Sequence, residues 1–345
     1  MSERALVTII IPSYGGASQL NRAISSVLHQ TYKNLELIVV DDNPPESRGR
    51  KQTEEIINQF SDARLKYIQH KKNLNGATAR NTGISQAKGK YICFLDDDDF
   101  YFPDRVRESV TCLEENEDCD CVLCGVMDCT DSGMYGVRYH YTKGGCLKKE
   151  LLTRKIIMGS GSNIFMTAKA LRSLNGFDTE FQRLQDDEFM VRFYRHYKAC
   201  TCDRLLIVKS RNGINNEPRL EKLYKSRRLF FDKYADDINE LNEQEKVLFY
   251  NYHFTALFRA ACYEDESELK EYVIRELTKI RRLTVKEKMQ LRLLKHTVGR
   301  TIVYLYSSLN IRGKINERKH SNQIRNTCSI DEQQFIDTNI RGIYK

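Results

Sequence analysis

The alternation of apolar runs with helical segments in the first hundred residues constrains the fold most. The run "ALVTIIIP" at 5–12 is uninterrupted, as expected for a strand buried on both faces. Between 20 and 28, apolar residues recur instead at the three- and four-residue spacing of an amphipathic helix. The same alternation continues with strands at 35–40, 65–70 and 90–95 and helices at 53–60 and 77–87. This order predicts an α/β fold with a mostly parallel central sheet flanked by helices.

Carboxylates stand directly behind two of the predicted strands. Asp41 and Asp42 follow "LELIVV", and the run Asp96–Asp99 follows "KYICFL". Ligands of open parallel sheets bind beyond the carboxyl ends of the strands, so these side chains and "PSY" at 12–14 are expected at one edge. Adjacent carboxylates repel each other, and a bound Mg²⁺ or Mn²⁺ would relieve that repulsion. The alternative is a solvated acidic turn, which the acidic run taken alone favours.

The pattern of the sequence changes near residue 215. Residues 1–215 carry the strand signals, whereas residues 216–345 are charged and have helical character, so two domains are predicted. No stretch approaches the roughly 20 apolar residues that a transmembrane helix needs. The N-terminus lacks the form of a signal peptide, and we therefore expect a cytoplasmic protein.

Eleven cysteines, six of them between Cys112 and Cys146, raise the question of a zinc site. Cys121 and Cys124 form one C-x₂-C pair, but no second pair follows at the spacing typical of zinc sites. The segment "CVLCGVM" indicates instead a buried strand in which cysteine serves as a small apolar residue. Free thiols in this number suit a reducing compartment.

Four blocks of the chain, in order and spacing, resemble one enzyme family. The blocks are "VTIIIPSY", "QTYKNLELIVVDD", "GATARNTGISQAKGKYICFLDDDD" and "GFDTEF…DDEFMVRF". They are similar to the family 2 glycosyltransferases, and the resemblance extends over residues 5–212. It implies a GT-A (Rossmann-like) fold, followed here by a C-terminal α-helical region, and transfer of a sugar from a nucleotide-sugar donor.

The resemblance also implies roles for residues that bind the donor. Pro12 and Tyr14 correspond to the loop that packs on the nucleotide base. Asp42 resembles the carboxylate that accepts a hydrogen bond from N3–H of uracil. Arg80, in "ARN", looks like the arginine that reaches the base or the diphosphate of the donor.

Further roles follow from the last two blocks. Asp96 and Asp97 correspond to residues that face the ribose hydroxyls, and Asp98 is similar to the final aspartate of the DxD motif, which binds the metal. Asp187 corresponds to the aspartate that acts as general base. Each residue also has an ordinary structural interpretation: Asp42 as a turn cap, Arg80 as a surface residue, and the acids near 187 as partners of a helix dipole.

Two positions depart from the pattern of the family. Gly15 and Gly16 stand where asparagine often follows the tyrosine of "PSY". After the last strand, "SRNGINNEP" retains Arg211 but lacks the family's usual histidine, which leaves the covering of the diphosphate open. Two other histidines, His70 and His140, are expected on the surface.

The basic charge of the chain is concentrated at its C-terminal end. Residues 271–345 hold 16 Lys and Arg against 7 Asp and Glu, which indicates an anionic surface as the partner of this end. Apolar residues recur at helical spacing between 291 and 309, flanked by basic residues. Residues 284–312 therefore form either an interfacial helix on the inner leaflet of the membrane or a helix packed on the rest of the protein.

The resemblance, together with the acidic run, implies an inverting glycosyltransferase that uses a UDP-sugar and Mg²⁺ or Mn²⁺. The expected acceptor is a saccharide or lipid-linked oligosaccharide in bacterial surface polysaccharide assembly, at the inner face of the membrane. One alternative is a non-catalytic protein whose basic end binds membrane or nucleic acid, although no nucleic-acid module is visible and nucleic acid is not the expected partner. Another is a sugar nucleotidyltransferase, which would need a glycine-rich basic phosphate loop that "PSYGGASQLNRAI" does not supply.

Overall fold

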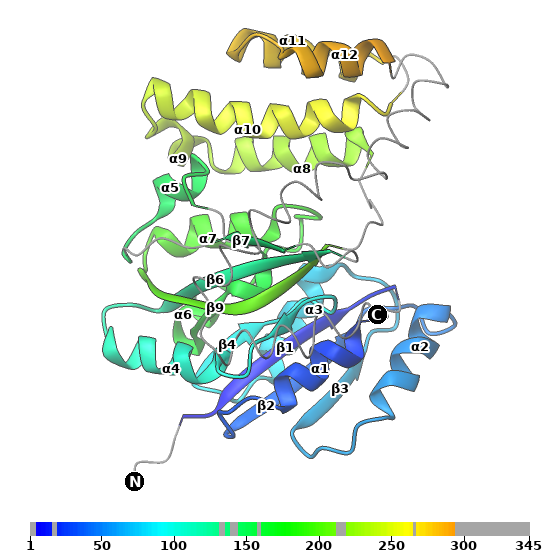
Figure 1. Cartoon of the computed structure of the whole chain (residues 1–345), viewed down its shortest axis with the longest axis vertical. Helices are drawn as coiled ribbons and strands as arrows, with labels where there is room; N and C mark the ends of the chain where they lie inside the picture. The colour runs from blue at the N-terminus through cyan, green and yellow to red at the C-terminus, as the bar shows by residue number, and fades with distance from the viewer. Residues whose placement is uncertain are drawn as a thin grey trace. The chain divides into compact units, whose positions relative to one another are not determined.

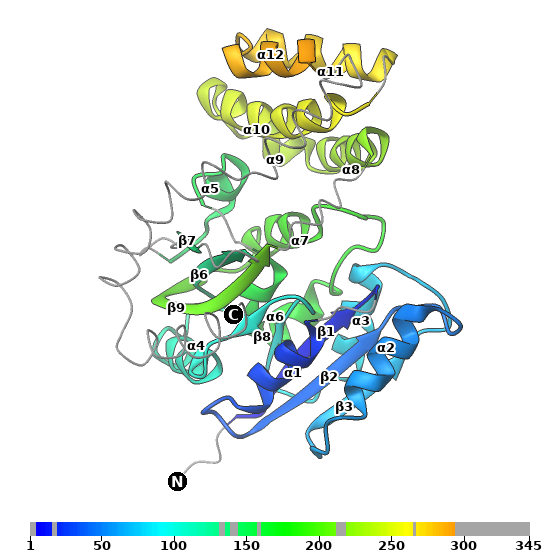
Figure 2. The ribbon, with the colours of Figure 1, turned by 45° about the vertical axis from the view of Figure 1, so that its right-hand side comes forward.

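A computed structural model of the chain describes most residues up to 293 (Figures 1 and 2). The described ranges are 5–15, 19–130, 135–138, 144–156, 160–211, 219–264 and 267–293. They form two compact units. One holds the described residues up to Lys148 and from Ile156 to Arg211, and the other holds Lys149–Lys155 and the described residues from Arg219 to Leu293. The predicted boundary at 215 and 216 lies outside the described residues.

Within the first unit, nine strands of the described chain form one sheet. They are β1 Val7–Ser13, β2 Leu35–Asp41, β3 Leu65–Gln69, β4 Tyr91–Phe94, β5 Phe100–Tyr101, β6 Cys121–Thr130, β7 Tyr135–Arg138, β8 Phe165–Thr167 and β9 Ala199–Arg211. Their order is β3-β2-β1-β4-β8-β6-β9-β5, with β7 paired to β6. The sheet is parallel from β3 to β4. Beyond β4 it is mixed, because β8 runs antiparallel to both of its neighbours while β6 and β9 are parallel.

Helices cover both faces of the parallel part. The helical segments of this unit are α1 Leu20–Leu28, α2 Arg48–Ile57, α3 Gly76–Gln86, α4 Arg105–Glu115, η1 Gly161–Asn163, α6 Ala168–Ser173 and α7 Gln185–Tyr194. Ile9 and Ile11 of β1 belong to the core cluster that holds the apolar stripe of α1. Ile10 faces the other way and packs so closely on α3 that a Cβ at Gly83 would lie 2.4 Å from it. The continuous apolar run thus reflects burial on two faces, and the predicted α/β fold class is confirmed.

The second unit is helical. It contains α8 Leu220–Lys233, α9 Ala235–Asn239, α10 Glu243–Ala261, α11 Glu268–Ile280 and α12 Val285–Leu293, together with most of α5 Lys148–Leu152. Helix α10 begins with a capping box formed by Asn242 and Glu245, and lies between α8 and α11 (Figure 2). Leu257 and Phe258 of α10 share a core with Val273 and Leu277 of α11.

The cysteine pair of the sequence lies in the sheet. Cys121 and Cys124 are fully buried in β6, which confirms that they serve as apolar strand residues. Burial raises the pKa of each thiol to about 12, as expected for cysteines packed in a core.

Three other expectations from the sequence concern membrane-spanning helices, a helix at the membrane surface and a surface histidine. None of the helices in those ranges is long and apolar enough to cross a bilayer. Of the stretch 284–312 expected at a membrane surface, residues 284–293 are described and 294–312 lie outside the described residues. His140, expected on the surface, also lies outside them.

Candidate active site

The carboxyl ends of β1, β2 and β4 meet at one edge of the sheet. The parallel register pairs Ser13 with Asp41 and Ile10 with Phe94, so the residues that follow each strand emerge side by side. The backbone N–H of Tyr14 donates to Oδ2 of Asp97 at 3.2 Å, which ties the first loop to the acidic loop. Pro12 is half-buried, whereas the Tyr14 ring is 58% exposed and offers an open aromatic face.

Asp42 is held in one orientation behind β2. It is buried, and its Oδ1 accepts from the backbone N–H of Leu74 and lies 2.7 Å from Nδ1 of His70, while Oδ2 accepts from the N–H of Asn75. The expectation that His70 lies on the surface is wrong, because its ring is buried between Asp42 and Thr82. A carboxylate oxygen has two lone pairs, so Oδ2 retains capacity for one further donor.

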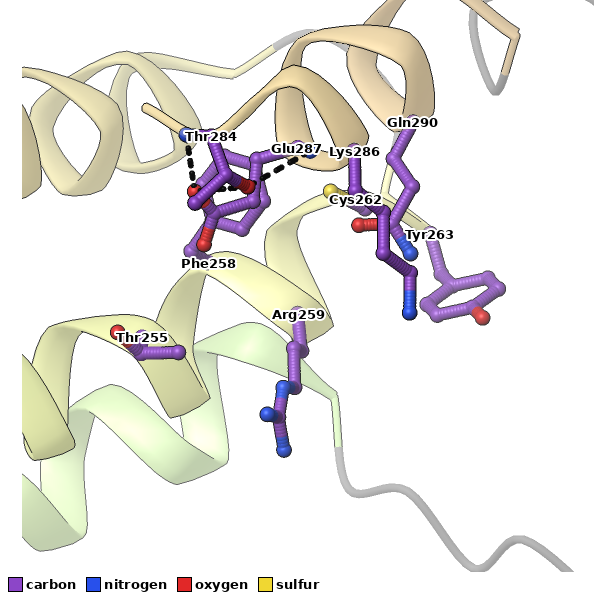
Figure 3. Close-up of a pocket in the computed structure, with 9 residues that line it drawn as sticks. All are labelled: Thr255, Phe258, Arg259, Cys262, Tyr263, Thr284, Lys286, Glu287 and Gln290. Carbon is purple, nitrogen blue, oxygen red and sulfur yellow. Dashed lines mark hydrogen bonds between the residues drawn. The ribbon is translucent and has the colours of Figure 1, made fainter. Parts of the chain in front are cut away.

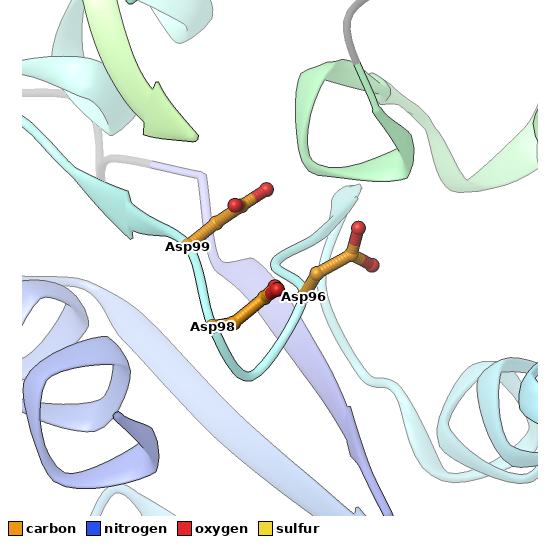
Figure 4. A group of neighbouring side chains, drawn as sticks. All are labelled: Asp96, Asp98 and Asp99. Atoms are coloured by element: carbon orange, nitrogen blue, oxygen red, sulfur yellow. The ribbon is translucent and has the colours of Figure 1, made fainter. Parts of the chain in front are cut away.

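The acidic run forms the loop between β4 and β5 (Figure 4). One carboxylate oxygen from each of Asp96, Asp98 and Asp99 lies within 4.8 Å of the others, the only such group of potential metal ligands in the described part of the chain. Burial and then the negative charges of Asp99 and Asp96 raise the pKa of Asp98 to about 7. Burial is likewise the largest cause that raises the pKa of Asp97 to about 7. A divalent cation would remove the repulsion among these oxygens.

Asp99 differs from the other acids of the loop because protein groups hold it on all sides. It is fully buried, and its Oδ2 accepts from the hydroxyls of Ser160 at 3.0 Å and Ser162 at 2.7 Å. The N–H of Ser210 donates to Oδ1, and Nζ of Lys209 lies 3.8 Å from Oδ2. No described group donates a hydrogen bond to the carboxylate of Asp98, which leaves Asp98 as the better candidate for a metal ligand.

Arg80 reaches the acidic loop from α3. Its Nη2 donates to Oδ1 of Asp96 at 2.7 Å, and its Nη1 donates to Oε1 of Gln185 at 2.9 Å. The guanidinium also lies over the ring of Phe177, 5.4 Å from its centroid. Arg80 is therefore a buried link between the acidic loop and the first turn of α7, not the exposed helix residue of the structural alternative.

Helix α7 brings Asp186 to the same cluster. Oδ1 of Asp186 is buried, and no described residue forms a hydrogen bond with it. Burial raises the pKa of Asp186 to about 6, Arg80 lowers it, and Asp96 raises it. Gly161 permits the close approach of η1, because a Cβ there would lie 2.8 Å from Oδ1 of Asp186. Asp187, the base expected from the sequence, follows in the same helical turn.

Three residues of this cluster were not singled out by the sequence. Asp186 was hidden because "QDDEF" offers three neighbouring acids in different helical directions. Lys209 follows the apolar run "LLIV" in β9, and a single lysine near a strand end only weakly indicates a functional residue. Asp99 was visible only as part of the acidic run. Arg211, the other candidate near this strand end, is the last residue of β9.

The second unit carries a separate pocket of about 280 Å³ between α10 and α12 (Figure 3). Its lining includes Arg259, Cys262 and Lys286, together with Glu287, which forms an ion pair with Arg281 at 2.7 Å. None of the residues predicted for the site lines it.

Comparison of the sequence with known proteins finds similarity to glycosyltransferases. The family model "Glycosyl transferase family 2" matches residues 8–174. An uncharacterized glycosyltransferase of Rickettsia bellii is 28% identical over 272 residues, which are 77% of this chain and 38% of that protein. The UDP-Glc:alpha-D-GlcNAc-diphosphoundecaprenol beta-1,3-glucosyltransferase of Escherichia coli is 38% identical over 111 residues, 32% of this chain and 42% of that protein. The chain spans 38% to 64% of the length of its Rickettsia relatives.

Solved structures support the GT-A-like fold. S. aureus TarS 1–349 in complex with UDP-GlcNAc gives a TM-score of 0.54 at 14% identity, covering 84% of this chain and 90% of that one. A mannosyltransferase of Pyrobaculum calidifontis in complex with GDP-Man and Mn²⁺ gives 0.53 at 15% identity, covering 89% and 88%. At these identities the likeness concerns the fold. The relatives named here are glycosyltransferases, and the part of this chain that matches the family 2 model is residues 8–174.

Proposed function

We propose that this chain is an inverting family 2 glycosyltransferase that moves a sugar from a UDP-sugar to a hydroxyl group of a saccharide acceptor. One observation carries the proposal. The exposed Tyr14, the buried carboxylate of Asp42, the buried Arg80 and the acidic loop meet at the carboxyl edge of one sheet. The Escherichia coli relative is named for UDP-Glc, and TarS 1–349 has been solved with UDP-GlcNAc, which supports UDP as the nucleotide.

The donor would bind along this edge. The Tyr14 ring and Pro12 form an apolar platform for the base, and the remaining lone pair on Oδ2 of Asp42 suits N3–H of uracil. Asp96 and Asp97 would face the ribose hydroxyls. Arg80 holds Asp96 in place and adds positive charge near the diphosphate.

The acidic loop fits a hard divalent cation, because its clustered carboxylate oxygens are the ligands that Mg²⁺ and Mn²⁺ prefer. Asp98 would be the main protein ligand, with Asp96 and Asp99 beside it. When bound, the ion would stabilise the negative charge that develops on the departing diphosphate. The Pyrobaculum mannosyltransferase has been solved in complex with Mn²⁺ and GDP-Man, which supports this assignment.

A carboxylate of α7 would act as general base. It accepts the proton of the acceptor hydroxyl while that oxygen forms the bond to the anomeric carbon, and the bond from the anomeric carbon to the diphosphate breaks. Asp187 is the residue expected from the sequence. Two observations favour Asp186 instead. No described residue forms a hydrogen bond with its buried Oδ1, and its pKa of about 6 suits a base, since an effective base titrates near the working pH.

The proposal also names the acceptor and the place in the cell where the enzyme acts. The diphosphoundecaprenol acceptor in the name of the Escherichia coli relative supports a lipid-linked saccharide in bacterial surface polysaccharide assembly. Such an acceptor would bring the enzyme to the cytoplasmic face of the membrane. The exposed Val285 and Met289, four residues apart on α12 among exposed basic residues, support contact with the inner leaflet.

The test is a screen of UDP-, GDP- and dTDP-sugars for hydrolysis in the presence of Mn²⁺, with the wild type and Asp98→Ala side by side. We expect UDP-sugar hydrolysis that requires Mn²⁺ and that Asp98→Ala lowers at least a hundredfold. Absence of binding and hydrolysis with every donor at millimolar concentration would refute the proposal. If Asp98→Ala is as active as the wild type, the assignment of Asp98 as metal ligand is refuted, but the proposed sugar transfer is not.

A further inference from the structure

Lys209 is fixed beside the acidic loop by the pairing of β9 on both sides. Val208 pairs with Phe100 of β5, the residue directly after the loop, and Lys209 itself pairs with Asp128 of β6. The next residue, Ser210, donates its N–H to Asp99. The backbone at Lys209 is therefore held in one place, and only its flexible side chain can move.

The ammonium group of Lys209 lies among carboxylates. Nζ is 3.8 Å from Oδ2 of Asp99, an ion pair just beyond hydrogen-bond length, and the side chain is 22% exposed. The negative charges of Asp99, Asp96 and Asp98 attract this ammonium group, whereas burial of the side chain opposes its charge. Two further cations lie at the cluster. Arg80 has little freedom because it donates to Asp96 and Gln185. Nη2 of Arg22 donates to the backbone carbonyl of Asp98 at 3.3 Å and to Oγ of Ser210 at 2.6 Å.

We propose that Lys209 occupies the acidic cluster as its counter-ion and turns to the diphosphate of the donor when a divalent ion binds. The inference rests on the proposed function. The ammonium repels a divalent ion held by Asp96, Asp98 and Asp99 and attracts a diphosphate in the same place. The metal therefore binds weakly by itself and tightly with the donor, which avoids a metal-filled site without substrate.

The experiment measures Mn²⁺ binding by electron paramagnetic resonance and UDP binding by titration calorimetry at pH 8. Lys209→Met removes the charge and keeps the length of the side chain, Lys209→Gln keeps a polar end, and Lys209→Arg keeps the charge. Lys198→Met is the matched control, because Lys198 precedes β9 and forms an ion pair with the exposed Asp118 at 3.1 Å, away from the acidic loop. Circular dichroism and thermal unfolding show which variants are folded.

We expect Lys209→Met and Lys209→Gln to bind Mn²⁺ at least tenfold more tightly without UDP, and to bind UDP at least tenfold more weakly with EDTA. Lys209→Arg and Lys198→Met should stay within threefold of the wild type in both assays. If the wild type binds Mn²⁺ with UDP but the two neutral variants show unchanged affinities, Lys209 only balances the charge of Asp99 and the inference is refuted. If the wild type binds neither Mn²⁺ nor UDP, the proposed function itself fails.

Discussion

Nη2 of Arg80 lies 2.7 Å from Oδ1 of Asp96, so one largely buried ion pair joins helix α3 to the acidic loop. The same guanidinium holds Gln185 at the start of α7. A single side chain thereby joins three separate segments, and the orientation of the loop depends on it.

Replacing Arg80 by alanine should therefore impair both stability and donor binding. Loss of a buried partner leaves Asp96 uncompensated, and we expect the free energy of unfolding to fall by ~2 kcal/mol. UDP affinity should fall at least tenfold, because the loop loses its anchor. Urea unfolding and titration calorimetry measure the two effects. Arg107→Ala, which breaks an exposed ion pair with Asp104, should change stability by less than ~0.5 kcal/mol, and equal losses in the two variants would contradict the prediction.

Gly161 should tolerate no side chain while Asp186 is present. A Cβ at this position would lie 2.8 Å from Oδ1 of Asp186 and 3.2 Å from Nη2 of Arg80. We expect Gly161→Ala to displace the Asp186 carboxylate and to lower kcat at least tenfold, with a loss of ~1 kcal/mol in unfolding free energy. Steady-state kinetics and chemical denaturation provide the measurements.

A double variant distinguishes this contact from a general backbone effect. In the Asp186→Ala background, Gly161→Ala should cost much less stability, because the nearest group is gone and only Nη2 of Arg80, at 3.2 Å, remains close. Additive losses would show that the strain lies elsewhere.

Substitution of the two neighbouring aspartates of α7 should have different effects on kcat. Asp186→Asn is expected to lower kcat by about 10³ and to leave UDP affinity unchanged, as loss of a general base would. Asp187→Asn should reduce kcat less than tenfold. The opposite ranking would restore Asp187 as the base. In the wild type, protonation of Asp186 should lower the rate tenfold for each pH unit below about 6.

His253 should make the helical unit sensitive to acid. The ring is buried among aromatic side chains, and burial followed by the charges of Arg227 and Arg154 lowers its pKa well below the usual value. The unfolded chain takes up this proton below its pKa of about 6.5 and the folded unit does not, so stability is full above that pH and decreases as the pH falls. We expect a loss of up to ~1.4 kcal/mol per pH unit.

Thermal and urea unfolding between pH 7.5 and 5 measure this slope. His253→Phe, which suits the aromatic surroundings, should flatten it. His196→Gln, at an exposed position, should leave it unchanged. A slope that survives in His253→Phe would assign the acid sensitivity to another group.

Exposed apolar side chains on α12 should matter for membrane contact. Val285 is 84% exposed and Met289 54%, so charged residues there do not disturb the core of the unit. We expect Val285→Asp/Met289→Asp to reduce co-sedimentation with vesicles of phosphatidylglycerol and phosphatidylcholine at least fivefold. Val247→Asp, at an exposed position on α10, is the control. Unchanged sedimentation of the double variant would exclude this surface.

Local sequence patterns were sufficient to predict the strands of the parallel half and the edge at which the carboxylates gather. Apolar runs report burial on two faces, and the carboxyl ends of parallel strands meet at one edge, so local pattern was sufficient for Asp42 and for the acidic run. The reversal of direction at β8 and the burial of His70 against Asp42 depend on packing between segments and could not be predicted from local pattern. It also brought Asp186 and Lys209 to the acidic loop, because their positions depend on the packing of α7 and on the register between β5 and β9. Such contacts join residues about a hundred positions apart, and the energies that select them arise only once the segments are packed together.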